Sequence, residues 1–358
     1  MTAVPYRFFD THTHFLQGTP LDRSAEIYKQ LFALTNTEKA AFLSLPNSFA
    51  EGLGPFQNIE ALYFKDFFSP NGYAFAGLIH NFSLDAESQS LDFLHQVETY
   101  FSSGFDALKM LEGKPTMRKA TNLKLTDYKF DRTFSFLEEN GIPLTIHNAD
   151  PATFWDLSKM LPSEIENGWY CDPSLPTKDE MFEEVMIIMQ RHPRLHLTLA
   201  HYGFTSDAIH QAKRFLDGYE YTALDMTPGW EQYTNMHADI ENWLPFLESH
   251  ADRFKYGTDF ENYNVSDDDI VNHLRPSNII RNFMETDTEH TIHGHTYRGI
   301  NLDSSLLQKM YYENAAKEYG NPKPISKAFI AAEIEKHLPI CTEEEKYDLS
   351  VVAAHFSL

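Results

Sequence analysis

The stretch Arg7-Phe8-Phe9-Asp10-Thr11-His12-Thr13-His14 joins a short apolar strand to a cluster of polar side chains. On an extended segment, residues two apart point to the same side, so the imidazoles of His12 and His14 can reach one ion. Histidine nitrogen is a preferred ligand of zinc and similar metals. Asp10 is a candidate to hold one of these imidazoles from behind. A lone His-x-His pair also arises on ordinary surfaces, so its meaning depends on what the chain places beside it.

Seven further apolar runs follow the first one along the chain. The eight candidate strands are Arg7–Phe9, Ala41–Leu45, Ala74–Ile79, Ala107–Leu111, Pro143–Ile146, His196–Ala200, Tyr221–Leu224 and Phe254–Tyr256. They do not alternate cleanly with polar residues, which is typical of strands buried on both faces. Amphipathic stretches lie between them, so the pattern predicts an α/β fold, a (β/α)8 barrel. An open doubly wound sheet is the alternative, but no glycine-rich phosphate fingerprint follows the first strand.

After residue 320 the pattern changes to helices alone. Ser326–His337 and Thr342–Ala354 have helical spacing. We therefore expect residues 1–320 to form the barrel and residues 321–358 to form a helical extension packed on its outside.

The composition excludes several classes of partner. The 358 residues include 29 Lys and Arg against 52 Asp and Glu, a formal net charge of −23. Such an acidic chain repels phosphate backbones and anionic lipid, so we expect neither a nucleic-acid nor a membrane partner. The N-terminus lacks the pattern of a signal peptide, and the two cysteines make no disulfide framework. These features favour a cytoplasmic enzyme, and the 17 histidines direct attention to metal chemistry.

Polar side chains also mark the ends of four other candidate strands. These positions are Lys109, His147, His201 and Asp259. The carboxyl ends of barrel strands meet on one face, where the catalytic residues of such barrels lie. Burying so many titratable groups together without an ion would carry a large desolvation cost. Each position alone is better explained as a satisfied core residue, but the coincidence favours a metal site.

The ordered set resembles the amidohydrolase superfamily, in its branch of amidohydrolase-related metal-dependent barrels. The matching segments are Asp10-Thr11-His12-Thr13-His14, Lys109, Ile146-His147-Asn148, Ala200-His201-Tyr202-Gly203, Gly257-Thr258-Asp259 and the later Tyr311–Ala315. The resemblance covers roughly residues 6 to 320. It implies a barrel with one or two divalent ions that catalyses hydrolysis or, in some branches, non-oxidative decarboxylation.

The resemblance also implies roles for individual residues. His12, His14, His147 and Asp259 would be metal ligands, and Asp259 would also take the proton of the attacking water. His201 would be a ligand of a second metal or a catalytic group that polarises the scissile carbonyl. Zinc is the expected metal, with manganese as the alternative.

Lys109 bears on the number of ions. In binuclear relatives a lysine at this strand end is carboxylated and bridges two metals, and a desolvated lysine near cations has the lowered pKa that this modification needs. The alternative is an ordinary lysine that pairs with a carboxylate or binds substrate. We expect one tightly held ion per chain and leave a second open.

Softer signals concern the substrate. The basic residues Lys114 and Arg118 follow the fourth strand and are candidates to bind a substrate carboxylate, although a solvated loop explains them too. Tyr202 and Trp230 are candidates to line a pocket, or to pack within loops. Relatives are often homo-oligomers, so we expect the same here.

Three functions are compatible with these residues. The first is a hydrolase of a small-molecule amide, lactone or ester-like bond that uses a metal-activated water. The second is a decarboxylase of an aromatic or unsaturated carboxylic acid on the same barrel. The third is a non-catalytic metal-binding barrel, which fits least well, because structural zinc sites are normally closed by four protein ligands.

Overall fold

The computed structural model describes residues 6–15, 18–45, 56–261 and 270–358. In this part of the chain, eight parallel strands pair in sequential order from β1 to β8. The strands are β1 Phe8–Thr13, β2 Thr37–Leu43, β3 Gly72–Gly77, β4 Ala107–Gly113, β5 Leu144–Asn148, β6 Leu197–Leu199, β7 Thr222–Asp225 and β8 Phe254–Lys255. Each of the eight predicted strands overlaps one of them. The predicted (β/α)8 barrel is confirmed, and the open sheet is wrong.

The barrel closes between β8 and β1. The Thr11 amide donates to the Tyr256 carbonyl at 2.9 Å, and the Asp259 amide donates to the His12 carbonyl at 2.8 Å. Just beyond, the His14 amide donates to the Phe260 carbonyl at 2.7 Å. This seam therefore runs through residues that the sequence marked for chemistry.

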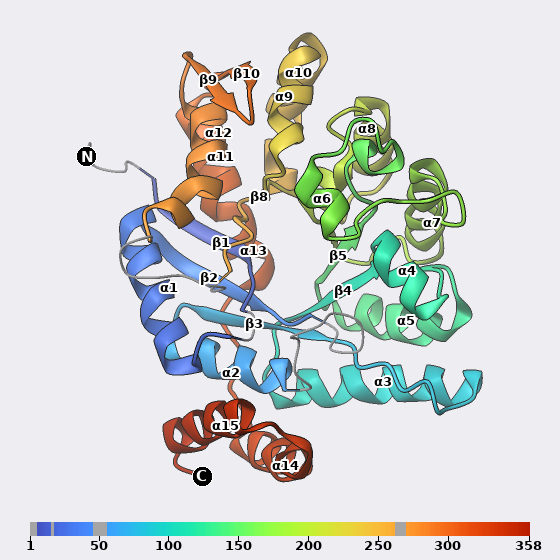
Figure 1. The fold of residues 1–358 in the computed structure, drawn as a ribbon, viewed down its shortest axis with the longest axis vertical. Helices are drawn as coiled ribbons and strands as arrows, with labels where there is room; N and C mark the ends of the chain where they lie inside the picture. The colour runs from blue at the N-terminus through green and yellow to red at the C-terminus, as the bar shows by residue number, and fades with distance from the viewer. Residues whose placement is uncertain (1–5, 16–17, 46–55, 262–269) are drawn as a thin grey trace.

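Helices surround the strands (Figure 1). The α-helices are α1 Leu21–Thr35, α2 Gln57–Phe67, α3 Ala86–Ser103, α4 Pro115–Thr121, α5 Asp131–Asn140, α6 Pro162–Glu166, α7 Lys178–Arg191, α8 Ile209–Gly218, α9 Trp230–Ala238, α10 Ile240–Ser249, α11 Arg275–Glu285, α12 Ser304–Gln308, α13 Asn314–Tyr319, α14 Lys327–His337 and α15 Glu343–Phe356. A hairpin of β9 Glu289–Ile292 and β10 His295–Arg298 follows α11. None of the described helices is both long and apolar enough to cross a bilayer.

Alternate residues of β4 show how the barrel is filled. Leu108 and Met110 belong to the large core between strands and helices, whereas Ala107 packs inside the barrel with Phe9 and Phe75. Tyr319 closes this inner cluster from α13, with its ring centroid 5.1 Å from that of Phe75. The amino end of the barrel interior is therefore apolar and aromatic.

The last two helices, α14 and α15, lie together beside α2 and α3 (Figure 1). Asp348 of α15 accepts a hydrogen bond from the Leu21 amide of α1 at 2.9 Å, and His355 pairs with Asp66 of α2 at 2.8 Å. Phe329 of α14 packs edge-on against Tyr100 and Phe105. The C-terminal extension thus covers helices on one side of the barrel.

Candidate metal centre and pocket

Two histidine lone pairs face each other at the closing seam. The Nδ1 atom of His12 lies 2.8 Å from Asp225 Oδ2, and that of His14 lies 3.0 Å from the Leu43 carbonyl oxygen. A carboxylate and a carbonyl only accept, so each Nδ1 carries the hydrogen and donates it. The Nε2 atoms of these two rings therefore present lone pairs, and they lie 3.1 Å apart.

Asp259 completes a set of three acceptors. Its Oδ1 atom lies 3.5 Å from His12 Nε2 and 3.4 Å from His14 Nε2. Ligands that bind one tetrahedral zinc at about 2.0–2.1 Å lie about 3.4 Å from each other. The three atoms thus have the spacing of ligands that share one divalent ion.

His201 extends the cluster from the turn after β6. One ligand atom each from His12, His201 and Asp259 lies within 4.8 Å of the others. His201 and Asp259 both have left-handed backbones, with φ of 56° and 60°. This conformation costs on the order of 1–3 kcal/mol for a residue with a side chain and is concentrated at functional sites. The backbone turns sharply where these two side chains enter the site.

The protonation of the cluster suits a cation. Burial lowers the pKa of His14 to about 3 and that of His201 to about 4, so both rings are neutral near pH 7. Burial would raise the pKa of Asp259, but electrostatic interactions with His12, His201, His14 and Lys109 hold it below its usual range. Neutral imidazoles beside an ionised carboxylate form the donor set that zinc and manganese bind.

Asp225, at the end of β7, is a site residue that we did not predict. Its Oδ2 accepts from His12 Nδ1, and its Oδ1 accepts from the His201 amide at 2.7 Å. It orients one histidine and the backbone of a second. The sequence contains a signal for Asp225, because Thr222-Ala-Leu-Asp225 is another apolar strand with a polar residue at its end.

The prediction that Asp10 holds an imidazole is wrong. Its carboxylate accepts from the His12 amide at 3.1 Å and from the amide and hydroxyl of Thr258 at 3.1 and 2.5 Å. Asp10 therefore ties β1 to the chain after β8 through backbone and hydroxyl groups. The role that we predicted for Asp10, holding an imidazole, belongs to Asp225.

His147 lies beside the cluster but has a polar partner of its own. Its ring centroid is 4.9 Å from that of His201, and its Nε2 lies 3.2 Å from Asp150 Oδ1. The same oxygen accepts from Lys114 Nζ at 2.8 Å, and Lys114 Nζ is 3.5 Å from His147 Nε2. His147 is thus held in a charged group at the edge of the cluster.

Lys109 lies within β4, which continues to Gly113, so its expected position at the strand end is wrong. The side chain is fully buried, and its Nζ lies 3.1 Å from His12 Nε2. Burial lowers the pKa of Lys109 to about 8. The ammonium is the one described cation beside the acceptors of His12, and it lies inside the barrel rather than at its mouth.

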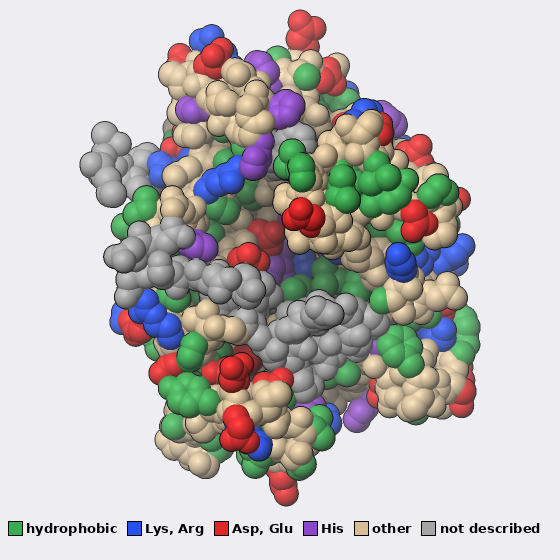
Figure 2. Space-filling model, viewed as in Figure 1, with side chains coloured by type: hydrophobic (Ala, Val, Ile, Leu, Met, Phe, Trp, Pro, Cys, Tyr) green, Lys and Arg blue, Asp and Glu red, His purple; other side chains and the backbone are tan. Residues whose placement is uncertain are grey.

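A cavity of about 650 Å³ opens above the cluster. Its lining includes His14, Lys114, His147, Asp150, Phe154, Glu164, Trp169, His201, Phe204, Glu231, Asp259 and Glu261. Figure 2 shows the molecule hollowed near the middle of this face, where acidic, histidine and hydrophobic side chains gather. The volume suits a small molecule with a reacting bond at the cluster.

The other predicted substrate residues lie outside this lining or next to it. The Arg118 guanidinium pairs with Glu184 at 2.5 Å and donates to the Leu123 carbonyl at 2.6 Å. Tyr202 is buried, with its hydroxyl 3.3 Å from that of Tyr233. Trp230 begins α9, directly after the lining residue Gly229. Of the predicted basic pair, Lys114 alone lines the cavity.

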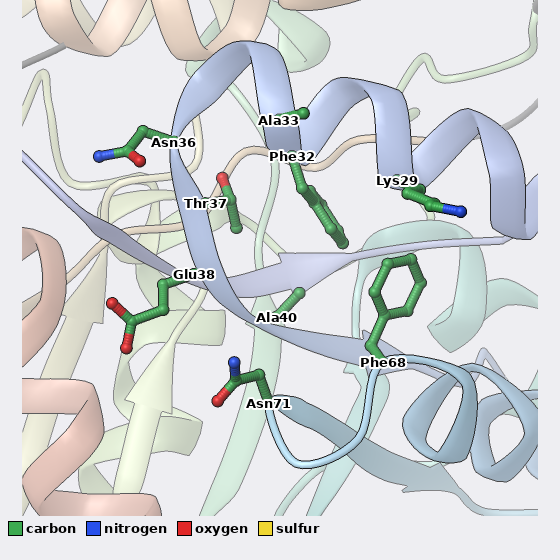
Figure 3. A pocket seen from close by; sticks show the side chains of 9 residues that line it. All are labelled: Lys29, Phe32, Ala33, Asn36, Thr37, Glu38, Ala40, Phe68 and Asn71. Atoms are coloured by element: carbon green, nitrogen blue, oxygen red, sulfur yellow. The ribbon is translucent and has the colours of Figure 1, made fainter.

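A smaller cavity of about 330 Å³ lies at the amino ends of β2 and β3 (Figure 3). Phe32 and Phe68 point toward each other across it, with ring centroids 5.2 Å apart. Neither a histidine nor a residue of the acceptor cluster is among its lining residues. The chemistry-bearing groups therefore gather at the carboxyl ends of the strands.

No family model and no curated protein matches the sequence. Among solved structures, a TIM-barrel protein from Bordetella bronchiseptica is 13% identical with a TM-score of 0.51, over 88% of this chain and 99% of its own. A 2,6-dihydroxybenzoate decarboxylase in complex with 2,6-dihydroxybenzoate is 13% identical with a TM-score of 0.50, over 88% and 98%. The 4-oxalomesaconate hydratase of Rhodopseudomonas palustris is 13% identical with a TM-score of 0.50, over 93% and 99%. At this identity the likeness to these structures is one of fold.

Proposed function

We propose that the chain is a metal-dependent hydrolase that cleaves an amide, lactone or ester-like bond of a small molecule. The observation that supports this most is the convergence of the Nε2 lone pairs of His12 and His14 with Asp259 Oδ1 within 3.1–3.5 Å. Three acceptors at this spacing repel one another unless a cation lies between them. The open cavity above them leaves room for water and substrate.

His12, His14, His201 and Asp259 have the chemistry to hold a divalent ion, for which zinc is the expected metal and manganese the alternative. When bound, such an ion lowers the pKa of a coordinated water and polarises a carbonyl. The ligand role of His147 stays a prediction, since its Nε2 lies against Asp150 here. We expect one tightly held ion per chain.

The surrounding residues would manage protons and orientation. Asp259 accepts the proton of the attacking water and passes it to the leaving group, and its side chain is 38% exposed and reaches the cavity. His201, where it does not serve as a ligand, donates a hydrogen bond from its neutral imidazole to the scissile carbonyl. Asp225 keeps the His12 ring in the tautomer whose Nε2 presents its lone pair.

Metal analysis together with a turnover assay tests this function. The purified protein is expected to hold about one divalent ion per chain, and chelator should abolish turnover of a panel of amides, lactones and esters. Added zinc or manganese should restore it. A His12→Ala/His14→Ala double variant should lose the ion and keep its fold, measured by elemental analysis and circular dichroism. Turnover that survives chelator would contradict the proposal.

A second candidate is decarboxylation of an aromatic or unsaturated acid. The position of Lys114 favours it, because this ammonium lines the cavity within 3.5 Å of His147 Nε2 and could hold a substrate carboxylate. Carbon dioxide release from candidate aromatic acids, with no cleavage of the hydrolase panel, would favour this reaction. A cytoplasmic location and a homo-oligomeric state stay predictions from the sequence.

A further inference from the structure

The cavity carries more negative charge than the metal cluster uses. Five carboxylates line it and one lysine does so. Asp150 is paired with Lys114 at 2.8 Å, and Asp259 belongs to the acceptor cluster. Of the remaining three, Glu164, Glu231 and Glu261, Glu231 has a carboxylate oxygen without a hydrogen-bond partner among the described residues.

Glu231 is the most constrained of these three carboxylates. It is the second residue of α9 and is only 5% exposed. Its Oε2 atom is buried and has no hydrogen-bond partner among the described residues. An unpaired buried carboxylate oxygen costs a substantial part of its hydration energy. Because Glu231 lines the cavity, this oxygen is suited to a hydrogen-bond donor that belongs to the ligand.

Lys178, the lysine whose charge acts on Glu231, does not fill this role. Lys178 attracts the charge of Glu231, but Lys178 Nζ binds Asp207 Oδ1 at 2.7 Å. Glu164 and Asp207 add negative charge around Glu231, and burial, with these charges, raises its pKa to about 7. A ligand cation beside Glu231 would favour its ionised form.

Two aromatic rings also line the cavity. Phe154 and Trp169 are stacked with ring centroids 5.7 Å apart and an interplanar angle of 27°. Trp169 is 38% exposed and lines the cavity. An aromatic face is a good surface for a planar or cationic group, because the ring quadrupole attracts positive charge.

We propose that Glu231, with the Phe154–Trp169 pair, forms a subsite for a cationic nitrogen group of the substrate, an ammonium, amidinium or guanidinium. This inference rests on the proposed function, because it places the reacting bond at the metal cluster and the cation at Glu231 in the lining of the same cavity. It differs from the sequence expectation of a carboxylate substrate, which relied on Lys114 and Arg118. Arg118 is paired with Glu184, and Lys114 is paired with Asp150.

A pair of isosteric probes tests the subsite without turnover. Benzamidinium and benzamide have nearly the same shape and differ by one positive charge. Calorimetric titration of the metal-loaded protein is expected to show benzamidinium binding about tenfold or more tightly than benzamide, since a charge-assisted hydrogen bond contributes that much. Glu231→Gln should remove this preference and leave benzamide binding unchanged. Glu248→Gln, on the exposed face of α10, is the control and should keep it.

The outcomes separate this subsite from the reaction itself. Equal binding of the two probes by the unmodified protein would overturn the subsite, and so would full benzamidinium preference in Glu231→Gln. Both results stand on binding alone, with metal content checked by elemental analysis. Chelator-insensitive turnover would instead overturn the metal-dependent reaction and leave the measured cation preference in place.

Discussion

Lys65 and Lys109 are both buried lysines, but the barrel surrounds them differently. Lys65, in the last turn of α2, donates to the Gly104 carbonyl at 2.6 Å and to the two oxygens of Asp106 at 2.9 and 2.7 Å. Lys109 lies three residues after Asp106, inside the barrel, and its hydrogen-bond contact among the described residues is His12 Nε2 at 3.1 Å. The Lys65 ammonium thus has three acceptors, while the Lys109 ammonium has one acceptor among the described residues.

This difference indicates that the Lys65 ammonium stabilises the fold, whereas the Lys109 ammonium is available to a ligand. Asp106 also accepts from the amides of Ala74 and Lys323, so the Lys65 pair joins α2, the sheet and the C-terminal extension. At the other end of the barrel, Lys109 contacts the Nε2 atom of His12, which belongs to the acceptor cluster. We expect substitutions at the two ends to affect different measurements.

The largest expected effect is on turnover at the cluster. Asp259→Asn keeps the shape of the side chain but removes its charge and basicity. Turnover should fall by about 10²–10⁴-fold, the contribution of general base catalysis. The midpoint of thermal unfolding should change little in the metal-free protein. An Asn variant with near-normal turnover would mean that the base is another residue.

At the opposite end, Lys65→Met should act on stability. It leaves the Asp106 carboxylate buried without its cation, a loss of about 3–5 kcal/mol of unfolding free energy. Urea unfolding followed by circular dichroism measures this loss, and the double variant Lys65→Met/Asp106→Asn should regain part of it. Lys336→Met removes an exposed pair with Glu333 and should change stability by less than about 1 kcal/mol. Equal losses in the two lysine variants would remove the distinction.

Lys109→Met should affect turnover more than stability, the opposite of Lys65→Met. It removes a buried ammonium that has one partner, so the unfolding free energy should stay within about 1 kcal/mol or rise. About one metal per chain should remain, while turnover falls through lost positioning. A loss of half of the bound metal would instead indicate that Lys109 bridges two ions. A destabilisation as large as that of Lys65→Met would break the comparison.

Glu60 of α2 is a buried carboxyl outside the site. Its effect on the pH dependence of stability extends the comparison between the two ends of the barrel. Burial, with the charges of Asp348 and Glu345, raises its pKa from 4.5 to about 8, so it is neutral near pH 7. Between these values the folded state binds more protons than the unfolded state, so stability falls as pH rises.

Glu60→Gln should therefore flatten the stability curve between pH 5 and pH 8. The expected change is roughly 3–4 kcal/mol over this range, because each pH unit between the unfolded and folded pKa values corresponds to about 1.4 kcal/mol. Urea unfolding at the two pH values measures it, and Glu98→Gln, exposed on α3, is the control. An unchanged slope in Glu60→Gln would mean that Glu60 is ionised in the folded protein.

The barrel could be predicted because its strands are apolar on both faces, a pattern that depends only on local sequence. The convergence of His12, His14, His201 and Asp259 followed from one rule, since all come at or after the carboxyl end of a strand. Asp225 obeys the same rule, and we missed it because an aspartate after a strand also begins ordinary turns.

The errors arose where a side chain finds a distant partner. Arg118 pairs with Glu184, 66 positions along the chain, and no local pattern announces such a pair. Asp10 precedes the histidines closely enough to support a ring, but Thr258 and the His12 amide take its oxygens. The sequence predicts at which edge of the barrel the polar side chains lie, but the packing determines which atoms they contact.

The seam between β1 and β8 has a consequence for synthesis. The Thr11 hydroxyl donates to the Tyr256 carbonyl, a partner 245 residues later in the chain. At about 5–20 residues per second, the ribosome needs roughly tens of seconds to add that length. During this interval the nascent chain carries the histidine pair without the aspartate that completes the set. Metal binding would therefore require that enough of the chain has left the ribosome for the barrel to close. A truncated translation product would be recognisable because it fails to retain the ion.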